Sequence, residues 1–323
     1  MATATKGIKV PAIAHRLLEA GALGITCAKL SEAEVMAAAG IGDIMVANQI
    51  VGAQKIARLV DVRRRADVIV AVDNPHNVAA LAEAARAAGV TLRLVIEVDI
   101  GMQRAGVASA KACVALARTI AGHTGVRFSG VMGWEGHAAA MLDRDHKAQA
   151  VMAAVRKLTQ CAELCRVEGL AVAIVSCGGT GTYWLSAAQP GITEIQAGGG
   201  VFGDVHYRND YGVDHPYALT LMTTVTSRPT RYRIICDAGK KAMSGDTALP
   251  VPIGIGPTRQ VRLSAEHATI ELEAAAEVPR VGEHLEFVVG YSDTTVHLHE
   301  TLHGVRGGRI EAVWPILGRG KLQ

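Results

Sequence analysis

Two glycine-rich segments hold residues whose types and spacing could bind an anion. "SCGGTGTYW" contains Gly178, Gly179 and Thr180, and "IQAGGGVFGD" contains Gly198 and Gly199. Each follows a short apolar run, so backbone N–H groups at successive strand ends could close around a phosphate. Glycines that only make tight turns are the alternative. Because neither loop has dinucleotide or Walker-type spacing, the phosphate would belong to another kind of cofactor.

Two further segments place polar side chains just after apolar runs. "EVDIGMQRAG" offers Glu97 and Arg104, and "GWEGH" offers Trp134, Glu135 and His137. Arginine can clamp a carboxylate or orient a cofactor, an indole can stack, and histidine can carry a proton. A surface ion pair or a structural histidine is the simpler interpretation of each residue taken alone. Their gathering at strand ends favours an active site.

A third segment, "YSDTTVHLHE", lies near the carboxyl end of the chain. If it is a strand, alternation places Tyr291, Asp293, Thr295, His297 and His299 on one face. Aspartate together with histidine could bind a metal ion. The solvated face of a sheet is the alternative.

The elements that must position these residues alternate along the first two-thirds of the chain. Short apolar runs are followed by Ala-rich helical patterns, which is typical of repeated βα units. The expected strands are residues 24–30, 43–48, 67–73, 92–99, 126–137, 171–179 and 192–200. If the residues before Lys6 are what remains of a first strand, the sequence predicts a (β/α)₈ barrel with its site at the strand carboxyl ends.

Local signals mark individual helices of the predicted barrel. Ser31 with Glu34 fits a capping box at the start of one helix, and Gly89 fits the end of another. After about residue 212 the pattern changes to short alternating runs with Gly and Pro between them. We therefore expect a barrel over residues 1–212 and a β domain over residues 213–323.

Composition excludes several classes of protein. Of the 323 residues 50% are hydrophobic and 4% aromatic, and the net charge is +3 with both signs interspersed. This balance favours an α/β fold, and the interspersed charges give no support for nucleic-acid binding. The six cysteines are scattered and form no CxxC pair, and no leader or long apolar run is apparent. These features predict buried structural thiols and a cytoplasmic location.

The segments taken together resemble a known family, the fold-type III pyridoxal-phosphate (PLP) enzymes. Within it the chain is similar to the D-threonine aldolase, 3-hydroxy-D-aspartate aldolase and D-serine dehydratase group. The matching segments span almost the whole chain in the order of the family. They include "KVPAIAHRLLEAGALGITCAKLSEAEV", "GIGDIMVANQIVG", "EVDIGMQRAGV", "GWEGH", "GGTGTY", "EIQAGGGVFGD", "DAGKKAMS" and "HGVRGGRIEAVWPILGRG".

The resemblance implies roles for individual residues. In "KGIKVP", Lys6 matches the lysine that forms the Schiff base with PLP. Arg104 matches a basic active-site residue, Trp134 stands where the family usually has Tyr, and His137 is a candidate base or substrate contact. The resemblance also assigns the remaining cofactor contacts, which are Asn48, Gln49, Gly178, Gly179, Thr180, Gly198 and Gly199.

The sequence departs from the family at two places. Members typically have His, one residue, then Cys or Asp at the metal site, and here Tyr291 and Asp293 stand there. Asp293 could hold Mg²⁺ or Mn²⁺, or the site could be metal-free. Members also usually begin with several dozen residues that include the first barrel strand. We therefore expect a first strand that is largely missing, in an incomplete version of a longer protein.

The activity that the resemblance implies is retro-aldol cleavage of a D-3-hydroxy amino acid to glycine and an aldehyde or glyoxylate. A dehydratase acting on D-serine or 3-hydroxyaspartate is the first alternative, and a non-catalytic PLP-binding protein is the second. Asp293 in place of Cys favours the aldolase. A small-molecule substrate and a homodimer are the expected partners.

Overall fold

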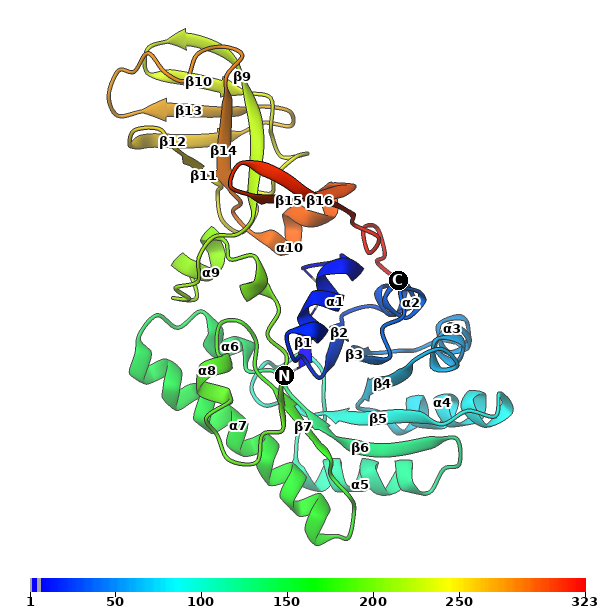
Figure 1. Ribbon diagram of the computed structural model, residues 1–323. Coiled ribbons are helices and arrows are strands. Elements are labelled where there is room, and N and C mark those ends of the chain that lie inside the picture. Colours follow the sequence, from blue (N-terminus) through cyan, green and yellow to red (C-terminus); the bar gives the residue numbers. More distant parts are fainter. Residues whose placement is uncertain (1, 5–6) are drawn as a thin grey trace. The chain divides into compact units, whose positions relative to one another are not determined.

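The computed structural model describes residues 2–4 and 7–323. The chain divides into two compact units, Met1–Gly198 with Gly320–Gln323, called here the barrel unit, and Gly199–Arg319, called the β unit. The sequence places the boundary after residue 212 rather than after Gly198, and it assigns Gly320–Gln323 to the β domain rather than to the barrel unit. The units are coloured along the chain in Figure 1 and are described separately.

The barrel unit is built on parallel strands in sequential order, from β1 to β8. The strands are β1 (Ala2–Ala4), β2 (Gly24–Cys27), β3 (Asp43–Gln49), β4 (Asp67–Val72), β5 (Leu92–Glu97), β6 (Val126–Met132), β7 (Ile174–Cys177) and β8 (Glu194–Ile195). β1 pairs in parallel with β2, and β8 lies against β1. The predicted (β/α)₈ barrel is confirmed, and the first strand, expected to be largely missing, is described over Ala2–Ala4.

Two apolar layers hold the barrel unit together. A cluster that includes Met45, Ile69 and Val95 fills the inside of the sheet. A larger cluster lies between the strands and the helices outside them, where Leu59 and Leu81 are fully buried (Figure 1). Because both faces of the strands are covered, they are continuous apolar runs in the sequence, as expected for a parallel sheet.

Helices follow the strands. In the barrel unit they are α1 (Pro11–Glu19), α2 (Leu30–Ala38), α3 (Ala53–Arg63), α4 (Pro75–Ala87), α5 (Ala110–Ala121), α6 (Gly136–Ala139), α7 (Arg144–Val167) and α8 (Tyr183–Ser186). Gly89 adopts a φ of 67° just after α4, as its predicted capping role requires.

The predicted capping box of α2 is wrong. The helix begins at Leu30, and Glu32 rather than Glu34 accepts hydrogen bonds from the amides of the two preceding residues, Ala28 and Lys29. The Ser31 hydroxyl instead donates to the carbonyl of Gln323. Glu34 pairs with Arg58. The Ser31 hydroxyl is thus bonded to a residue distant in sequence and does not cap the helix.

The β unit begins with short helical segments, η1 (Gly199–Val201) and α9 (Val205–Asn209), and continues with antiparallel strands. Its main sheet has the order β11-β14-β9-β10-β13-β12. These strands are β9 (Thr220–Thr230), β10 (Arg233–Cys236), β11 (Val251–Ile253), β12 (Thr258–Leu263), β13 (Ala268–Leu272) and β14 (His284–Val288). A separate hairpin joins β15 (Thr301–Arg306) to β16 (Arg309–Pro315). The prediction of a β domain is confirmed.

The expected strand over "YSDTTVHLHE" is wrong. Its residues form α10 (Ser292–Thr295) and η2 (Val296–Leu298). Both the amide and the hydroxyl of Ser292 donate to Asp204 Oδ2, each over 2.8 Å. These bonds to a residue distant in sequence accompany the start of a helix at Ser292. Alternation therefore does not place these side chains on one face.

The cysteines in the described part of the chain are free, buried thiols, as predicted. Cys161 and Cys165 lie one turn apart on α7, and the sulfur of Cys165 is 3.9 Å from that of Cys113 on α5. Across the described residues, no helix is both long and apolar enough to cross a membrane.

Candidate active site

A chain of contacts joins the carboxyl ends of the barrel strands. Gln49, the last residue of β3, donates from Nε2 to Oε2 of Glu97, the last residue of β5, over 2.6 Å. Arg104 follows β5 in sequence and lies with Nη2 3.8 Å from Glu97 Oε1. Asn48 donates to the Ala28 carbonyl, just after β2, over 3.0 Å. Residues from three strand ends are thus in one network.

Trp134 extends this network to the next strands. It follows β6, and the guanidinium of Arg104 lies 5.5 Å from the centre of its ring. A Cβ added to Gly179 would lie 2.9 Å from Trp134 Nε1, so the loop after β7 packs directly on the indole edge. A Cβ at Gly136 would lie 2.7 Å from the same ring. Glycine is needed at both positions because the indole occupies the space of a side chain.

The environment of Glu97 changes its acidity. The residue is 7% exposed. Burial raises the pKa of Glu97, while the Gln49 hydrogen bond and the positive charge of Arg104 oppose that change. The carboxyl therefore retains a proton more readily than a carboxyl in water. Glu97 was noted from the sequence as a strand-end residue, and the structure makes it the centre of the network.

His137 is exposed at the start of α6. Its imidazole lies against Gly101, where an added Cβ would be 2.6 Å from Nε2. The loop that carries Gly101 is fixed by Asp99, whose Oδ1 accepts from the amides of Gly101 and Gln103, each over 3.0 Å. Asp99 thus positions the backbone on which the imidazole rests.

The first glycine loop is tied down by its own neighbours. The amide of Gly178 donates to Glu135 Oε2 over 3.2 Å, and the amide of Gly179 donates to Thr182 Oγ1 over 3.2 Å. These two amides are therefore already engaged, contrary to the idea that each glycine amide offers its hydrogen to an anion. Thr180, the next residue of this loop after Gly179, is 5% exposed.

The second glycine loop contains the division between the two compact units. Gly198 is buried in the barrel unit, and Gly199 begins the β unit. A Cβ at Gly199 would overlap the ring of Tyr207. Glycine at 199 is thus explained by packing within the β unit.

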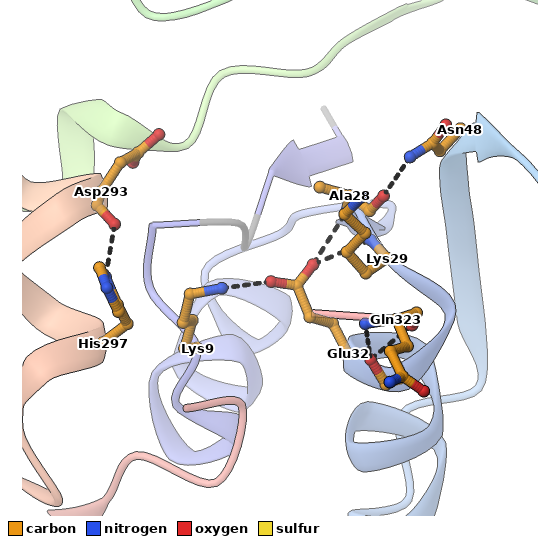
Figure 2. Close-up of polar contacts among 9 residues, drawn as sticks. Lys9, Ala28, Lys29, Glu32, Asn48, Asp293, His297 and Gln323 are labelled. Carbon is orange, nitrogen blue, oxygen red and sulfur yellow. Dashed lines mark hydrogen bonds and ion pairs between the residues drawn. The ribbon is translucent and has the colours of Figure 1, made fainter. Parts of the chain in front are cut away.

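Lys6, the predicted Schiff-base lysine, lies outside the described residues. The segment that follows it is well anchored, as Figure 2 shows. Lys9 is 7% exposed, has a φ of 55° and pairs with the buried Glu32. The same carboxylate binds the amides of Ala28 and Lys29. Sequence reasoning missed this pair, although an acidic residue at the start of α2 was its available signal.

The barrel residues fit PLP. The phosphate would meet the tightly turned Gly178–Thr182 segment through groups other than the Gly178 and Gly179 amides, which already donate to Glu135 and Thr182. The ring would meet the Trp134 indole, and Arg104 would supply a cationic contact. Gly179 leaves no room for a side chain against Trp134, which is the close backbone approach that such a loop requires. Lys9, paired with Glu32, fixes the chain three residues from the position that would hold the cofactor covalently.

The residues of the β unit do not fit a divalent metal ion. Tyr291 donates its hydroxyl to Asp293 Oδ2 over 2.9 Å, and burial strongly raises the pKa of Tyr291, which keeps the phenol protonated. His299 Nε2 lies 2.7 Å from the Ala242 carbonyl. His297 Nδ1 lies 3.4 Å from the Asp293 carbonyl, as Figure 2 shows. Within residues 2–4 and 7–323, no group of three or more His, Cys, Asp or Glu side chains could hold a metal.

Comparison with known proteins agrees with this architecture. Residues 3–206 match the family model described as alanine racemase, N-terminal domain, and residues 218–305 match the putative serine dehydratase domain. A D-threonine aldolase of Arthrobacter sp is 36% identical over 322 residues, which cover 98% of this chain and 84% of that protein. A 3-hydroxy-D-aspartate aldolase of Paracoccus denitrificans (strain Pd 1222) is 35% identical over 314 residues, covering 93% of this chain and 80% of the relative.

A solved structure is also similar over the full length. The crystal structure of D-threonine aldolase from Filomicrobium marinum matches with a TM-score of 0.96 and 32% identity, covering 100% of this chain and 89% of the other. Both the barrel and the β unit lie within these matches. The chain therefore belongs to the fold-type III pyridoxal-phosphate enzymes, in the lyase group that contains the D-threonine and 3-hydroxy-D-aspartate aldolases.

Proposed function

We propose that this enzyme cleaves a D-3-hydroxy amino acid to glycine and an aldehyde, or to glycine and glyoxylate when the substrate is 3-hydroxy-D-aspartate. The observation that carries the proposal is the network of Gln49, Glu97, Arg104 and Trp134 at the strand carboxyl ends. The names of the aldolase relatives supply the reaction class.

The residues of the barrel unit can be given roles in this reaction. Lys6 would hold PLP covalently, with Arg104, Trp134 and the Gly178–Thr182 segment contacting it, and Asn48, Gln49 and Gly198 completing the proposed set. When bound, PLP supplies an electron sink for the pair of electrons left on Cα. Arg104 is the group that can also bind a substrate carboxylate.

Proton transfer is assigned to His137, because its imidazole is exposed and fixed against Gly101. His137 takes the proton of the 3-hydroxyl as the Cα–Cβ bond breaks. Cβ then becomes the aldehyde carbon, and Cα retains the bonding electrons. Return of the proton held by His137 to Cα completes glycine and restores the neutral imidazole. Glu97, with its raised pKa, is a buried carboxyl able to keep Gln49 and Arg104 in place.

No step is assigned to a metal ion. The phenol of Tyr291 and its hydrogen bond to Asp293 make a poor ligand set for Mg²⁺ or Mn²⁺, which prefer ionised oxygen ligands. The proposed reaction therefore depends on His137 rather than on a metal-bound base.

A dehydratase is the second candidate function. It would expel the 3-hydroxyl as water and give a 2-oxo acid and ammonia, and the match of residues 218–305 to a putative serine dehydratase domain favours it. A protein that binds PLP without catalysis is the alternative of another class. We also propose that the protein is cytoplasmic and that it forms a homodimer. Light scattering of the purified chain would test whether it is a dimer.

One panel of reactions separates these functions. The PLP-loaded protein is incubated with D-threonine, 3-hydroxy-D-aspartate and D-serine, and the products are assayed as aldehyde, glyoxylate or 2-oxo acid. We expect glycine with acetaldehyde or glyoxylate, and loss of activity in Lys6→Ala. Release of ammonia with a 2-oxo acid would establish the dehydratase instead. Bound PLP without any product would support the non-catalytic alternative.

A further inference from the structure

Glu135 is a buried carboxylate that the proposed reaction does not use. It follows Trp134 after β6 and is fully buried, with 0% of its surface exposed. Its Oε2 accepts from the Gly178 amide over 3.2 Å, and its Oε1 accepts from the Thr182 hydroxyl over 2.7 Å and from the Ser186 hydroxyl. One side chain thus binds the beginning of the glycine loop, its end, and the helix α8 that follows it.

Thr182 links Gly179 to the same carboxylate. The Thr182 hydroxyl accepts from the Gly179 amide over 3.2 Å while it donates to Glu135. The two glycine amides are therefore held by the same carboxylate, one directly and the other through a hydroxyl. Such a linked set of hydrogen bonds restricts the loop to one conformation.

The middle of the loop is held by a second buried charged residue. Lys147 of α7 is 5% exposed and donates to the Gly181 carbonyl over 3.3 Å. Its ammonium also lies 5.6 Å from the centre of the Trp184 ring. Glu135 therefore accepts hydrogen bonds from an amide and hydroxyls of this region, and Lys147 donates to one carbonyl of the segment.

This arrangement costs more than tight turns require. Burial of a carboxyl group costs free energy unless its oxygens are hydrogen-bonded, and both oxygens of Glu135 accept bonds from this segment and α8. Glycine turns by themselves form without such a group. A fully buried glutamate whose described hydrogen bonds all go to this segment and α8 points to a need for one fixed loop conformation.

We propose that Glu135 is the positioning residue that holds the Gly178–Thr182 segment in the conformation that receives the phosphate of PLP. The inference rests on the proposed function only in taking PLP as the cofactor. Glu135 acts through the backbone and does not contact substrate. Because it orders the phosphate end of the site, it sets the preference for PLP over pyridoxal, which lacks the phosphate.

The test compares binding of PLP and pyridoxal to the full-length protein after its cofactor has been removed. Binding is followed by the visible absorbance of the bound cofactor and by quenching of tryptophan fluorescence. Glu135→Gln replaces one acceptor oxygen by a donor that faces the Gly178 amide or the hydroxyls. We expect the Kd for PLP to rise by about tenfold or more, with the Kd for pyridoxal unchanged.

Two further variants protect the test against a folding defect. Thr182→Val removes the hydroxyl between Gly179 and Glu135, and Ser186→Ala removes one donor from α8. Both should weaken PLP binding in the same direction and by less than Glu135→Gln. Far-ultraviolet circular dichroism and thermal unfolding check that each variant is folded.

Glu194→Gln is the matched control, because it makes the same chemical change at the amino end of the strands. Glu194 lies there with Asp43 and Arg93 in a depression of about 300 Å³. This control should leave both dissociation constants unchanged. An unchanged or increased ratio of PLP to pyridoxal affinity in Glu135→Gln would overturn the inference while leaving the proposed function intact. Failure of the parent protein to bind PLP would reject the proposed cofactor itself.

Discussion

The barrel unit and the β unit each bring a carboxylate together with an aromatic side chain, with different results. In the barrel unit, Glu97 lies by Arg104, whose guanidinium lies over the Trp134 ring. The side chain of Arg104 remains 57% exposed. In the β unit, Asp293 accepts the hydroxyl of Tyr291 itself. The first arrangement leaves an exposed cation to meet a ligand, whereas in the second the phenol hydroxyl is bonded to the carboxylate beside it.

The surroundings of Tyr291 reinforce this difference. Its ring centre lies 4.8 Å from that of His206 and 6.0 Å from that of Tyr207. Burial and the charge of Asp293 raise the pKa of Tyr207 as well. Protonated phenols packed edge to face form a stable interior cluster. The comparison supports the proposal that places the chemistry in the barrel unit and assigns no step to the Tyr291 region.

The largest expected effect is a difference in kcat/KM between substitutions of two arginines, each of which lies over an aromatic ring. Arg104→Ala removes the guanidinium from Trp134 and should lower kcat/KM by about a thousandfold, as loss of a charged active-site donor does. Arg208 lies 4.0 Å from the Tyr217 ring centre in the β unit. Arg208→Ala should lower the midpoint of thermal unfolding and keep kcat/KM. Equal losses in both variants would contradict the comparison.

A smaller loss is expected when the support of His137 is displaced. Gly101 has a φ of 142°, and a methyl group there would overlap the imidazole. Gly101→Ala should lower kcat about tenfold by moving the proposed base, with little change in PLP binding. Gly254→Ala is the control, because Gly254 has a φ of 76° and open space around its Cβ position. If the control loses as much kcat, backbone strain rather than His137 explains the effect.

The response to metal ions tests the β unit. Removal of divalent ions with EDTA should leave the activity of the parent protein unchanged. Tyr291→His replaces the protonated phenol with an imidazole beside Asp293 and should create a modest activation by Mn²⁺, measured as kcat with and without added metal. Strong inhibition of the parent protein by EDTA, reversed by Mn²⁺, would show that Asp293 holds a metal despite its bond to Tyr291.

The smallest effect concerns the dependence of stability on pH. Burial raises the pKa of Glu97, so its folded-state pKa lies above the unfolded value. Its contribution to stability is then fully present below the unfolded pKa and is lost as pH rises through the folded pKa. Glu97→Gln should therefore gain stability relative to the parent protein as pH rises to neutral, and thermal unfolding from acidic to neutral pH measures this. A constant difference across that range would contradict the raised pKa.

The barrel was predictable because its strands are buried on both faces and its helices alternate with them. Apolar runs such as residues 67–73 can be recognised without any tertiary information, and polar residues after them mark the strand ends. Arg104 and Trp134 were therefore found from sequence, although their contact was not. The first strand was less visible, since its described part is the three residues Ala2–Ala4.

The remaining errors come from contacts distant in sequence. Alternation predicted a strand through Asp293, but hydrogen bonds from Ser292 to Asp204 stabilise a helix there. Ser31 looked like a helix cap, but it binds Gln323 at the other end of the chain. The role of Glu135 was hidden for the same reason, because its three partners lie more than forty residues away. Local pattern does not report such partners.

The bond between Ser31 and Gln323 also affects the order in which the chain can be completed during synthesis. Residues 320–323 belong to the barrel unit, whereas residues 199–319 form the β unit between its two parts. Ser31 donates its amide and hydroxyl to the Gln323 carbonyl and accepts from the Gln323 amide. These bonds at the start of α2, one residue from the Glu32 that holds Lys9, cannot form until the ribosome has made the whole β unit. The edge of the barrel that carries Lys9 is therefore expected to be among the last parts of the nascent protein to reach its final form.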